Sequence, residues 1–355
     1  MGSETSNSCS TVRPPTPESN TATGSSAWAG IAPWWQRPRR KYARGIRALI
    51  VTNMYPTPAR PELGSFVRDQ VEALRRTGAA EIEVFAFAPG GARVYLGAAV
   101  NLRRRARGGK RADFDVVHAH FGLSLWPALA ARGRAHAVTL HGTDLAHPRS
   151  RPITLAGLRR LDLVATVSDA LAEQIPGWAV RHPVAVLPAG VNVDRFSPMP
   201  REAARSALGL DPDEPCLLFP ADPRRPEKRF DRAQELAGDT RLHTLGAVAP
   251  DQVPLWVNAA NAVLVPSQRE GFGLAALEAL ACDVPVLATP VGVAPRALAG
   301  IAGALCAPYE RAVWTEALAP HLNVADPRVR GRASASRWST DAMAARVLDA
   351  WQSLL

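Results

Sequence analysis

Hydrophobic and polar positions alternate in a regular order from Ile46 onward. Short runs rich in Val, Ile, Leu and Ala predict buried strands at 46–53, 81–88, 115–120, 136–141, 163–168 and 184–188. Segments with helical spacing separate several of them, as at 64–78, where apolar residues from Phe66 to Leu74 share one face and Gly78 follows the end. Because strands and helices alternate, we expect a parallel sheet with right-handed crossovers.

A second alternating series begins at Cys216, with strands predicted at 216–221, 241–246, 262–267, 284–289 and 303–308 and helices at 228–237, 251–260 and from 274. We therefore predict two doubly wound, Rossmann-like α/β domains. The expected divisions are a basic, Trp-containing tail at 1–44, an N-terminal domain at 45–195, a linker at 196–214, a C-terminal domain at 215–332 and a C-terminal helix at 333–355. We expect this last helix to cross back to the N-terminal domain. Open α/β sheets bind ligands beyond the carboxyl ends of their strands, so the expected site is a cleft between the domains.

The bulk composition agrees with a large intracellular chain. With 355 residues and 47% hydrophobic composition, the chain can form cores for two domains. It contains four Cys and no C-x-x-C pair, which argues against a disulfide framework or a zinc site and favours a reducing compartment. No apolar run approaches the roughly 18 residues that span a bilayer, and the N-terminus lacks the pattern of a secretory signal. We therefore expect a cytoplasmic protein.

Positive charge is the main deviation from an average composition. The net charge is +10, and basic residues cluster at 37–44 and 103–111. Such clusters suit nucleic acid, phosphorylated substrates or an anionic membrane surface, and the alternative is an ordinary basic surface. Residues 1–44 have the composition of a disordered segment, and Trp28, Trp34 and Trp35 lie beside cations, which suggests peripheral contact with the inner face of the membrane. The alternative is that this tail is solvated and contacts no membrane. The clusters lack interleaved aromatic residues at stacking spacing, so nucleic acid is the weakest partner.

The most informative stretch runs from residue 269 to residue 292. Glu270 precedes Gly271 and Gly273, and a helix of Ala and Leu follows with Glu278 one turn inside it. Glycines let a ligand approach the main chain, and the free N–H groups at Leu274 and Ala275 favour a phosphate. A diphosphate bound there would bring attached sugars near both carboxylates. If Glu278 is considered by itself, the alternative to a ligand-binding role is an ordinary solvated residue on the helix surface.

This stretch resembles the E-x7-E segment of retaining glycosyltransferases of the GT-B fold, family 4 (group 1). Six further segments resemble family segments in the family's order, at 51–78, 114–122, 139–144, 165–171, 187–198 and 219–231. The overall pattern is similar to that of enzymes of teichuronic acid and exopolysaccharide biosynthesis. The resemblance implies a metal-independent hexosyltransferase-type enzyme (EC 2.4) that needs no cofactor and moves a sugar from a nucleotide sugar to a glycan or lipid-linked acceptor.

The resemblance also implies roles for individual residues. Glu270 would contact the donor sugar and Glu278 the ribose. The remaining donor-side candidates are Gly64, Gly271, Phe272, Gly273, Leu274 and Ala275, and the candidates for neutralising the leaving diphosphate are Lys228 with Arg224 or Arg225. His141 would lie near the reacting sugar. Of His118 and His120, one is expected to be packed and His120 is the candidate to face the acceptor, together with Asp144.

Structural alternatives stay open for several of these residues. His141 could make only a structural hydrogen bond, Asp144 could cap a helix, Gly64 could be a turn glycine, and the loop around Lys228 could be a solvated basic loop. Departures from the family pattern, such as Ala189 in P-A-G and the short stretch after Lys228, leave room for two other functions. One is a nucleotide-sugar-binding partner protein without transferase activity, and the other is a GT-B-type sugar epimerase.

Overall fold

The computed structural model describes residues 45–107, 114–246 and 248–355. The tail predicted at 1–44 and part of the basic cluster at 103–111 lie outside the described residues. In the described part, no helix is both long and apolar enough to cross a membrane.

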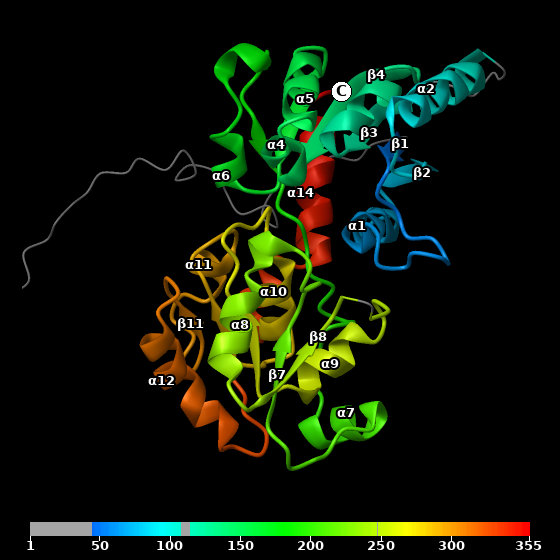
Figure 1. The fold of residues 1–355 in the computed structure, drawn as a ribbon. Helices are drawn as coiled ribbons and strands as arrows, with labels where there is room; N and C mark the ends of the chain where they lie inside the picture. The colour runs from blue at the N-terminus through cyan, green and yellow to red at the C-terminus, as the bar shows by residue number, and fades with distance from the viewer. Residues whose placement is uncertain (1–44, 108–113, 247) are drawn as a thin grey trace, which may run out of the picture. The chain divides into compact units, whose positions relative to one another are not determined.

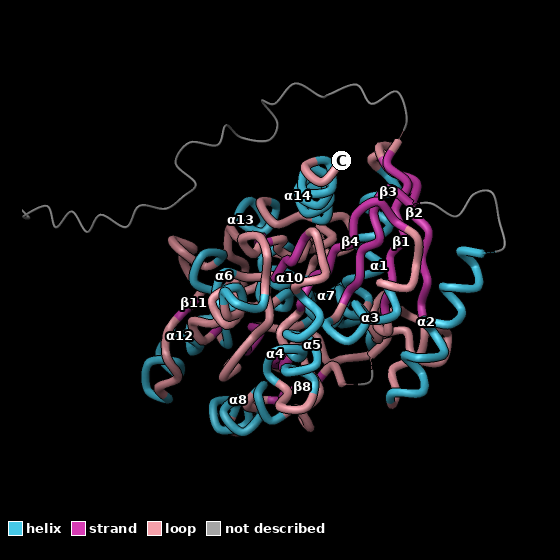
Figure 2. Tube along the Cα trace, turned by 90° about the horizontal axis from the view of Figure 1, so that it is seen from above, coloured by secondary structure: helices cyan, strands magenta, loops and turns pink. Residues whose placement is uncertain are grey.

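The first half of the chain forms a parallel sheet with the strand order β2-β1-β3-β4-β5-β6. Figure 2 shows its first four strands side by side. The bounds are Ile46–Thr52 for β1, Ala80–Ala86 for β2, Phe114–His120 for β3, Gly133–Leu140 for β4, Leu163–Thr166 for β5 and Ala185–Val186 for β6. Strands β1 and β3 are buried on both faces, as expected of continuous apolar runs in a parallel sheet.

The second half forms another parallel sheet with the order β11-β10-β9-β7-β8. Its bounds are Cys216–Phe219 for β7, Arg241–Thr244 for β8, Ala262–Val265 for β9, Val286–Ala288 for β10 and Leu305–Cys306 for β11. Both sheets are open and doubly wound, so the predicted α/β class with two Rossmann-like domains is confirmed.

Helices connect the strands, as Figure 1 shows. In the first half they are α1 (Ser65–Arg76), α2 (Ala92–Arg107), η2 (Gly122–Ser124), α3 (Leu125–Ala128), α4 (Thr143–Ala146), α5 (Ser150–Leu158), α6 (Asp169–Ala172) and η3 (Gly177–Ala179). In the second half they are α7 (Arg201–Leu208), η4 (Pro226–Lys228), α8 (Phe230–Ala237), α9 (Val253–Ala259), α10 (Leu274–Ala281), α11 (Ala294–Ala297), α12 (Arg311–Leu322), α13 (Arg332–Ser336) and α14 (Thr340–Gln352).

The C-terminal helix α14 packs on the first sheet. Met343, Val347 and Trp351 are buried in the cluster that contains Ile50 and Val116 of β1 and β3. Ser339 caps the helix by accepting a hydrogen bond from the Ala342 N–H at 3.2 Å. The last helix therefore crosses back to the N-terminal domain, as predicted.

Helix α7 lies inside the segment 196–214, which the sequence pattern predicts to be a linker. Arg205 of α7 is fully buried and donates hydrogen bonds to the carbonyl oxygens of Ala259 and Pro212 at 3.0 and 2.8 Å. It also donates to Asn261 Oδ1 at 3.1 Å. These bonds attach α7 to the C-terminal domain, so within the predicted linker only the residues before α7 form an irregular connection between the two domains.

Candidate functional site

The loop between β9 and α10 places Glu270 opposite Lys228. Lys228 ends η4 and donates through Nζ to both carboxylate oxygens of Glu270 at 2.7 Å. Ser267 Oγ donates to Glu270 Oε1, also at 2.7 Å. The side chains of Lys228 and Glu270 are 16% and 9% exposed, so the ion pair is largely removed from water. A fixed cation and a fixed acceptor therefore lie side by side at the carboxyl end of the second sheet.

The start of α10 presents backbone N–H groups. Gly273 precedes the helix with φ 95°, a conformation that favours glycine. Among the described residues, the N–H groups of Gly273, Leu274 and Ala275 have no acceptor. Phe272 is buried, and its carbonyl oxygen accepts from the Val293 N–H at 2.7 Å. The loop is thus fixed from behind, while its free N–H groups can bind an anion.

The two domains approach each other closely at Gly271. A Cβ atom at Gly271 would lie 2.1 Å from the carbonyl oxygen of His141. Gly142 has φ 110°, and a Cβ atom there would lie 3.1 Å from the Cα of Gly271. Ser168 Oγ donates to the Gly271 carbonyl oxygen at 3.0 Å. The absence of side chains at the two glycines therefore lets the His141 loop contact the loop before α10.

Glu278 lies among charges from both domains. Burial raises the pKa of Glu278 to about 7; Asp69 raises it further, and Arg195 and Lys228 oppose the shift. Arg195 donates to the two carboxylate oxygens of Asp69 at 3.0 and 2.6 Å. This environment does not fit the alternative that Glu278 is an ordinary solvated residue.

Arg224 and Arg225 are exposed and each contacts a neighbouring carboxylate. Arg224 donates to Asp222 with its shortest bond at 2.8 Å, and Arg225 donates to Glu227 with its shortest bond at 2.7 Å. Of the three cations predicted in this loop, Lys228 is the one that contacts Glu270.

Asp144 is fully buried below the His141 loop. Its carboxylate oxygens accept hydrogen bonds from the N–H groups of His141, Gly142 and Gly122 at distances from 2.8 to 3.2 Å. A carboxylate with these bonds fixes the turn after β4 and so positions His141. Asp144 lies in the first turn of α4 and is not the cap of this helix, whose N-cap is Gly142 without a side-chain hydrogen bond.

Gly64 precedes α1 with φ 68°. A Cβ atom there would lie 2.2 Å from the Met54 carbonyl oxygen. The position requires glycine because the loop after β1 folds against the start of α1. The structure thus gives Gly64 a definite backbone role and leaves its contact with a ligand as a prediction.

Three histidines form a row that ends at the loop before α10. The rings of His118 and His120 stack with centroids 5.0 Å apart, and those of His120 and His141 with centroids 5.3 Å apart. His120 Nδ1 and His141 Nε2 lie 3.1 Å apart, and Gln70 Nε2 lies 3.2 Å from His120 Nε2. His118 and His120 are both buried, so the expectation that only one of them is packed is wrong.

The burial of His118 and His120 has a physical cause in the packing around them. Trp351 of α14 donates through Nε1 to His118 Nδ1 at 2.9 Å, and Gln70 and His141 contact His120. Burial lowers the pKa of His118 and His141 well below the usual value and that of His120 to about 4. The row is therefore neutral at physiological pH, and His120 contacts His141 instead of open solvent.

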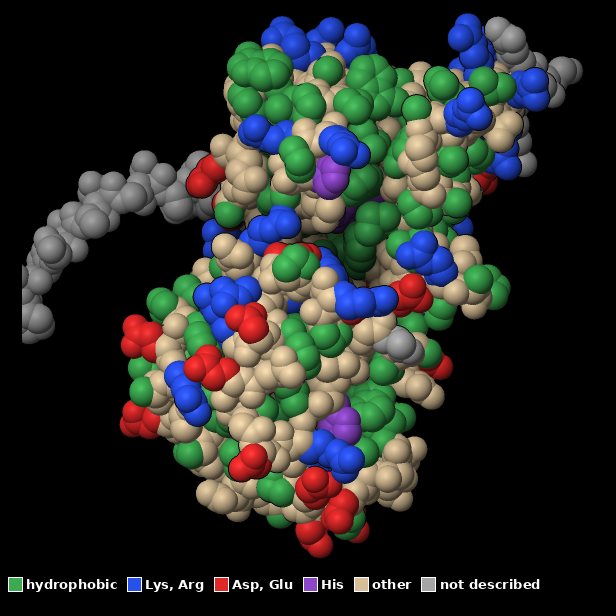
Figure 3. All heavy atoms as spheres, viewed as in Figure 1, with side chains coloured by type: hydrophobic (Ala, Val, Ile, Leu, Met, Phe, Trp, Pro, Cys, Tyr) green, Lys and Arg blue, Asp and Glu red, His purple; other side chains and the backbone are tan. Residues whose placement is uncertain are grey.

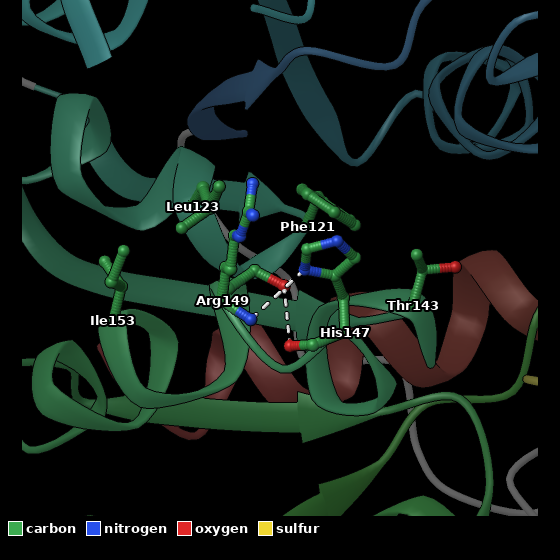
Figure 4. A pocket seen from close by; sticks show the side chains of 7 residues that line it. Phe121, Leu123, Thr143, His147, Arg149 and Ile153 are labelled. Atoms are coloured by element: carbon green, nitrogen blue, oxygen red, sulfur yellow. Dashed lines mark hydrogen bonds between the residues drawn. The ribbon is translucent and has the colours of Figure 1, made fainter. Parts of the chain in front are cut away.

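A cavity of about 270 Å³ lies beside this row in the N-terminal domain. Figure 4 shows the side chains of Phe121, Leu123 and Ile153 around it, with Arg149 and His147 nearby. Phe121 directly follows His120, and Thr143, which also lines the cavity, is two residues from His141. The cavity is thus a candidate for the acceptor side of the site.

Five residues near the site are absent from the sequence-based predictions: Asp69, Gln70, Ser168, Arg195 and Trp351. The sequence pattern could have identified Gln70, because this residue shares the apolar face of α1 with Val67, Val71 and Leu74. A polar residue in such a stripe indicates a buried polar partner. In the described part of the chain, no group of three or more His, Cys, Asp or Glu is arranged to bind a metal ion. Metal independence stays a prediction.

Comparisons with known proteins agree with this geometry. The family model described as Glycosyltransferase Family 4 matches residues 40–195, and the model described as Glycosyl transferases group 1 matches residues 217–323. The two matches correspond to the two parallel-sheet domains. The chain therefore belongs to the family 4 (group 1) glycosyltransferases, and the predicted family is confirmed.

Relatives in sequence include proteins named D-inositol 3-phosphate glycosyltransferase. The one from Actinosynnema mirum is 30% identical over 275 residues, which are 61% of this chain and 66% of the relative. The one from Mycolicibacterium smegmatis is 29% identical over 275 residues, 62% of each chain. The matched region thus spans just under two thirds of the length of these relatives.

Solved structures support the GT-B fold. Sucrose-phosphate synthase from Thermosynechococcus elongatus matches with a TM-score of 0.65 and 19% identity, covering 88% of this chain and 99% of that one. Anabaena HepE in complex with UDP and glucose matches with a TM-score of 0.63 and 15% identity, covering 87% of this chain and all of the other (100%).

Proposed function

We propose that the protein is a retaining glycosyltransferase that uses a nucleotide sugar as donor. The main supporting observation is the largely buried ion pair of Lys228 with Glu270 beside the free N–H groups at the start of α10. A nucleoside diphosphate sugar has an anionic diphosphate between two polyols. The site has a cation and amide donors between two carboxylates, which is the complementary arrangement.

Each group then has a defined role. The diphosphate binds the N–H groups of Leu274 and Ala275 and the Nζ of Lys228, with Arg224 or Arg225 able to reach the outer phosphate oxygens. Glu278 accepts hydrogen bonds from the ribose hydroxyls, and Glu270 accepts them from the donor sugar. As the bond from the sugar to the diphosphate breaks, negative charge grows on the leaving oxygen next to Lys228.

The proton of the acceptor needs no separate base in this scheme. The departing phosphate oxygen gains negative charge on the same face of the sugar that the acceptor hydroxyl attacks, so it can take the proton directly. The two carboxylates bind hydroxyl groups and are not the acid and nucleophile of a glycosidase. Fixed cations and helix N–H groups stabilise the leaving diphosphate, so no metal ion is required.

For the acceptor we propose a glycan or a lipid-linked saccharide of the cell envelope or an exopolysaccharide, used at the inner face of the membrane. A second candidate is a phosphorylated cyclitol, because relatives of this chain are named D-inositol 3-phosphate glycosyltransferases. The exposed Arg149 beside the cavity of the N-terminal domain suits an anionic acceptor of either kind.

The test is donor hydrolysis by the purified full-length chain, measured with a panel of nucleotide sugars in the presence of EDTA. We expect slow release of a nucleoside diphosphate from one donor, unaffected by EDTA, and retention of the anomeric configuration when an acceptor is supplied. Donor binding by thermal shift without any release would favour the binding-protein alternative. A changed sugar configuration without an acceptor product would favour the epimerase.

A further inference from the structure

Five of the eight large hydrophobic side chains that are exposed among the described residues lie on neighbouring elements of the N-terminal domain. Val94, Leu96 and Val100 belong to α2, Ile153 belongs to α5, and Trp178 belongs to η3. Leu96 and Trp178 are 65% and 64% exposed. Single exposed apolar residues are ordinary, whereas a group of them indicates an interaction surface.

Direct contacts join these elements. Helix α3 packs against both α2 and α5. Trp126 of α3 donates through Nε1 to the Ile153 carbonyl oxygen at 3.3 Å, and Arg159 donates through Nη1 to the Trp178 carbonyl oxygen at 2.8 Å. We call the surface formed by α2, α3, α5 and η3 the basic face. Figure 3 shows hydrophobic and Lys or Arg side chains side by side over the α5 and α2 end of this domain.

The charged side chains of the helices that form the basic face are all positive. Segments 84–112 and 145–161 contain no Asp or Glu. Seven described arginines of these segments are exposed and form no ion pair with a described carboxylate: Arg93, Arg103, Arg104, Arg149, Arg151, Arg159 and Arg160. On α2, Leu96 and Val100 are spaced to lie on one side with Arg93 and Arg103.

The combination of exposed hydrophobic side chains and exposed arginines on the basic face distinguishes between anionic partners. Cations alone suit nucleic acid as well as a membrane, because both present phosphates. Exposed aliphatic side chains on the same helix side as the cations gain nothing from a phosphate backbone, but they gain free energy when they enter the boundary between lipid head groups and acyl chains. Trp178 suits that boundary for the same reason.

The cavity described above opens at the edge of the basic face, because Arg149 and Ile153 line it. Phe121, which also lines it, has φ 78° and ψ 136°, a strained conformation for a residue with a side chain. The Phe121 N–H donates to the Thr139 carbonyl oxygen at 3.1 Å, and the Phe121 carbonyl oxygen accepts from the Ser124 N–H at 3.0 Å. These two hydrogen bonds maintain the conformation. Strain of this kind is typical of binding and active sites.

We propose that the basic face docks on an anionic lipid membrane and that the cavity receives an anionic lipid from it, with Arg149 at the charged head and Phe121, Leu123 and Ile153 at the first part of the chain. The docking is independent of catalysis. That the lipid is the acceptor rests on the proposed function, since Thr143 and Phe121 place the cavity beside His141.

Vesicle binding by the full chain tests the docking. We expect binding to vesicles of phosphatidylcholine and phosphatidylglycerol and weak binding to phosphatidylcholine alone. Leu96→Asp with Trp178→Asp, and separately Arg103→Glu with Arg160→Glu, should each lower partitioning at least about tenfold. The matched control is Val313→Asp with Val324→Asp, which changes two exposed residues of the C-terminal half and should leave binding unchanged. Donor hydrolysis should be unchanged in all three double variants.

Three outcomes would overturn the docking proposal. One is wild-type partitioning of both variants of the basic face. Another is loss of binding only when Trp28, Trp34 and Trp35 are replaced by Ala. The third is binding of the wild type to RNA or to an acidic polypeptide without binding to anionic vesicles. None of these readouts depends on transferase activity, so they leave the proposed function to its own test.

Titration with farnesyl phosphate tests the cavity. We expect saturable binding of farnesyl phosphate that weakens at least about tenfold in Ile153→Asp and in Arg149→Ala, with little binding of farnesol or inorganic phosphate. Equal binding of inorganic phosphate would contradict a lipid site, and unchanged binding in both variants would place the ligand elsewhere. Leu96→Asp, which is outside the cavity, is the control.

Discussion

On the N-terminal side of the candidate site, His118 and His120 are buried, His141 is half-buried and all three are neutral, whereas on the C-terminal side Lys228 and Glu270 form a largely buried ion pair. Burial of an ionisable group requires either loss of its charge or an opposite charge in contact. On the N-terminal side, hydrogen bonds position the neutral histidines. The charged side has its cation where the leaving diphosphate develops charge.

Removal of the Lys228 charge should have the largest effect on turnover. Lys228→Met leaves the Glu270 carboxylate buried without its partner and removes the charge that faces the diphosphate. We expect turnover to fall about a hundred- to a thousandfold, measured as release of nucleoside diphosphate. Arg241→Met is the control, because Arg241 forms an exposed ion pair with Glu214 in the same domain. Equal turnover in Lys228→Met and the wild type would remove Lys228 from the mechanism.

The contact between the two sides should be the next most sensitive feature. Gly271→Ala places a Cβ atom 2.1 Å from the His141 carbonyl oxygen, so the two loops must separate. We expect kcat/KM to fall about ten- to a hundredfold with the fold intact. Gly91→Ala is the control, since a Cβ atom there meets nothing within 4 Å. Turnover of Gly271→Ala at the wild-type rate would mean that the loops need not touch during the reaction.

The two sides should respond to pH in opposite directions. The pKa of Glu278 is about 7 in the folded protein and its ordinary value is 4.5, so the folded state binds the extra proton and stability falls as pH rises between these values. The pKa of His120 is about 4 and its ordinary value is 6.5, so the unfolded state binds the extra proton and stability rises with pH in that window.

Two variants separate these contributions in denaturant unfolding at pH 5, 6 and 7. Glu278→Gln should make the slope of unfolding free energy against pH more positive by at most about 1.4 kcal/mol per pH unit, and His120→Gln should make it less positive. The slope is compared, not the absolute stability, because both substitutions also change packing. Slopes that change in the same direction in both variants would contradict the assigned environments.

The smallest expected effect is at the far end of the histidine row. Trp351→Phe keeps most of the buried ring but removes the N–H that donates to His118 Nδ1 at 2.9 Å. We expect a loss of about 1 kcal/mol in unfolding free energy and less than a twofold change in turnover, measured by denaturant unfolding and donor hydrolysis. A larger loss of turnover than of stability would show that the row has a more direct part in the reaction.

Sequence patterns predict much of this fold because both sheets consist of apolar runs that alternate with helical spacing. The sequence analysis does not predict helix α2, because the arginines of this segment are interpreted as a charged cluster. It does not predict α7 either, because prolines and polar residues surround this helix and indicate a linker. In the site, Glu270, Glu278 and Lys228 were identifiable from the family motifs. Asp69 and Trp351 were not, because they reach the site through the packing of α1 and through the return of α14 to the first sheet.

Hydrogen exchange at the start of α10 tests the central claim most directly. The nucleotide is first chosen as the nucleoside diphosphate that gives the largest thermal shift, and exchange is then compared with and without it. The free N–H groups of Gly273, Leu274 and Ala275 should exchange markedly more slowly with the nucleotide bound. Unchanged exchange at these amides in the saturated protein, with protection elsewhere, would contradict the placement of the diphosphate.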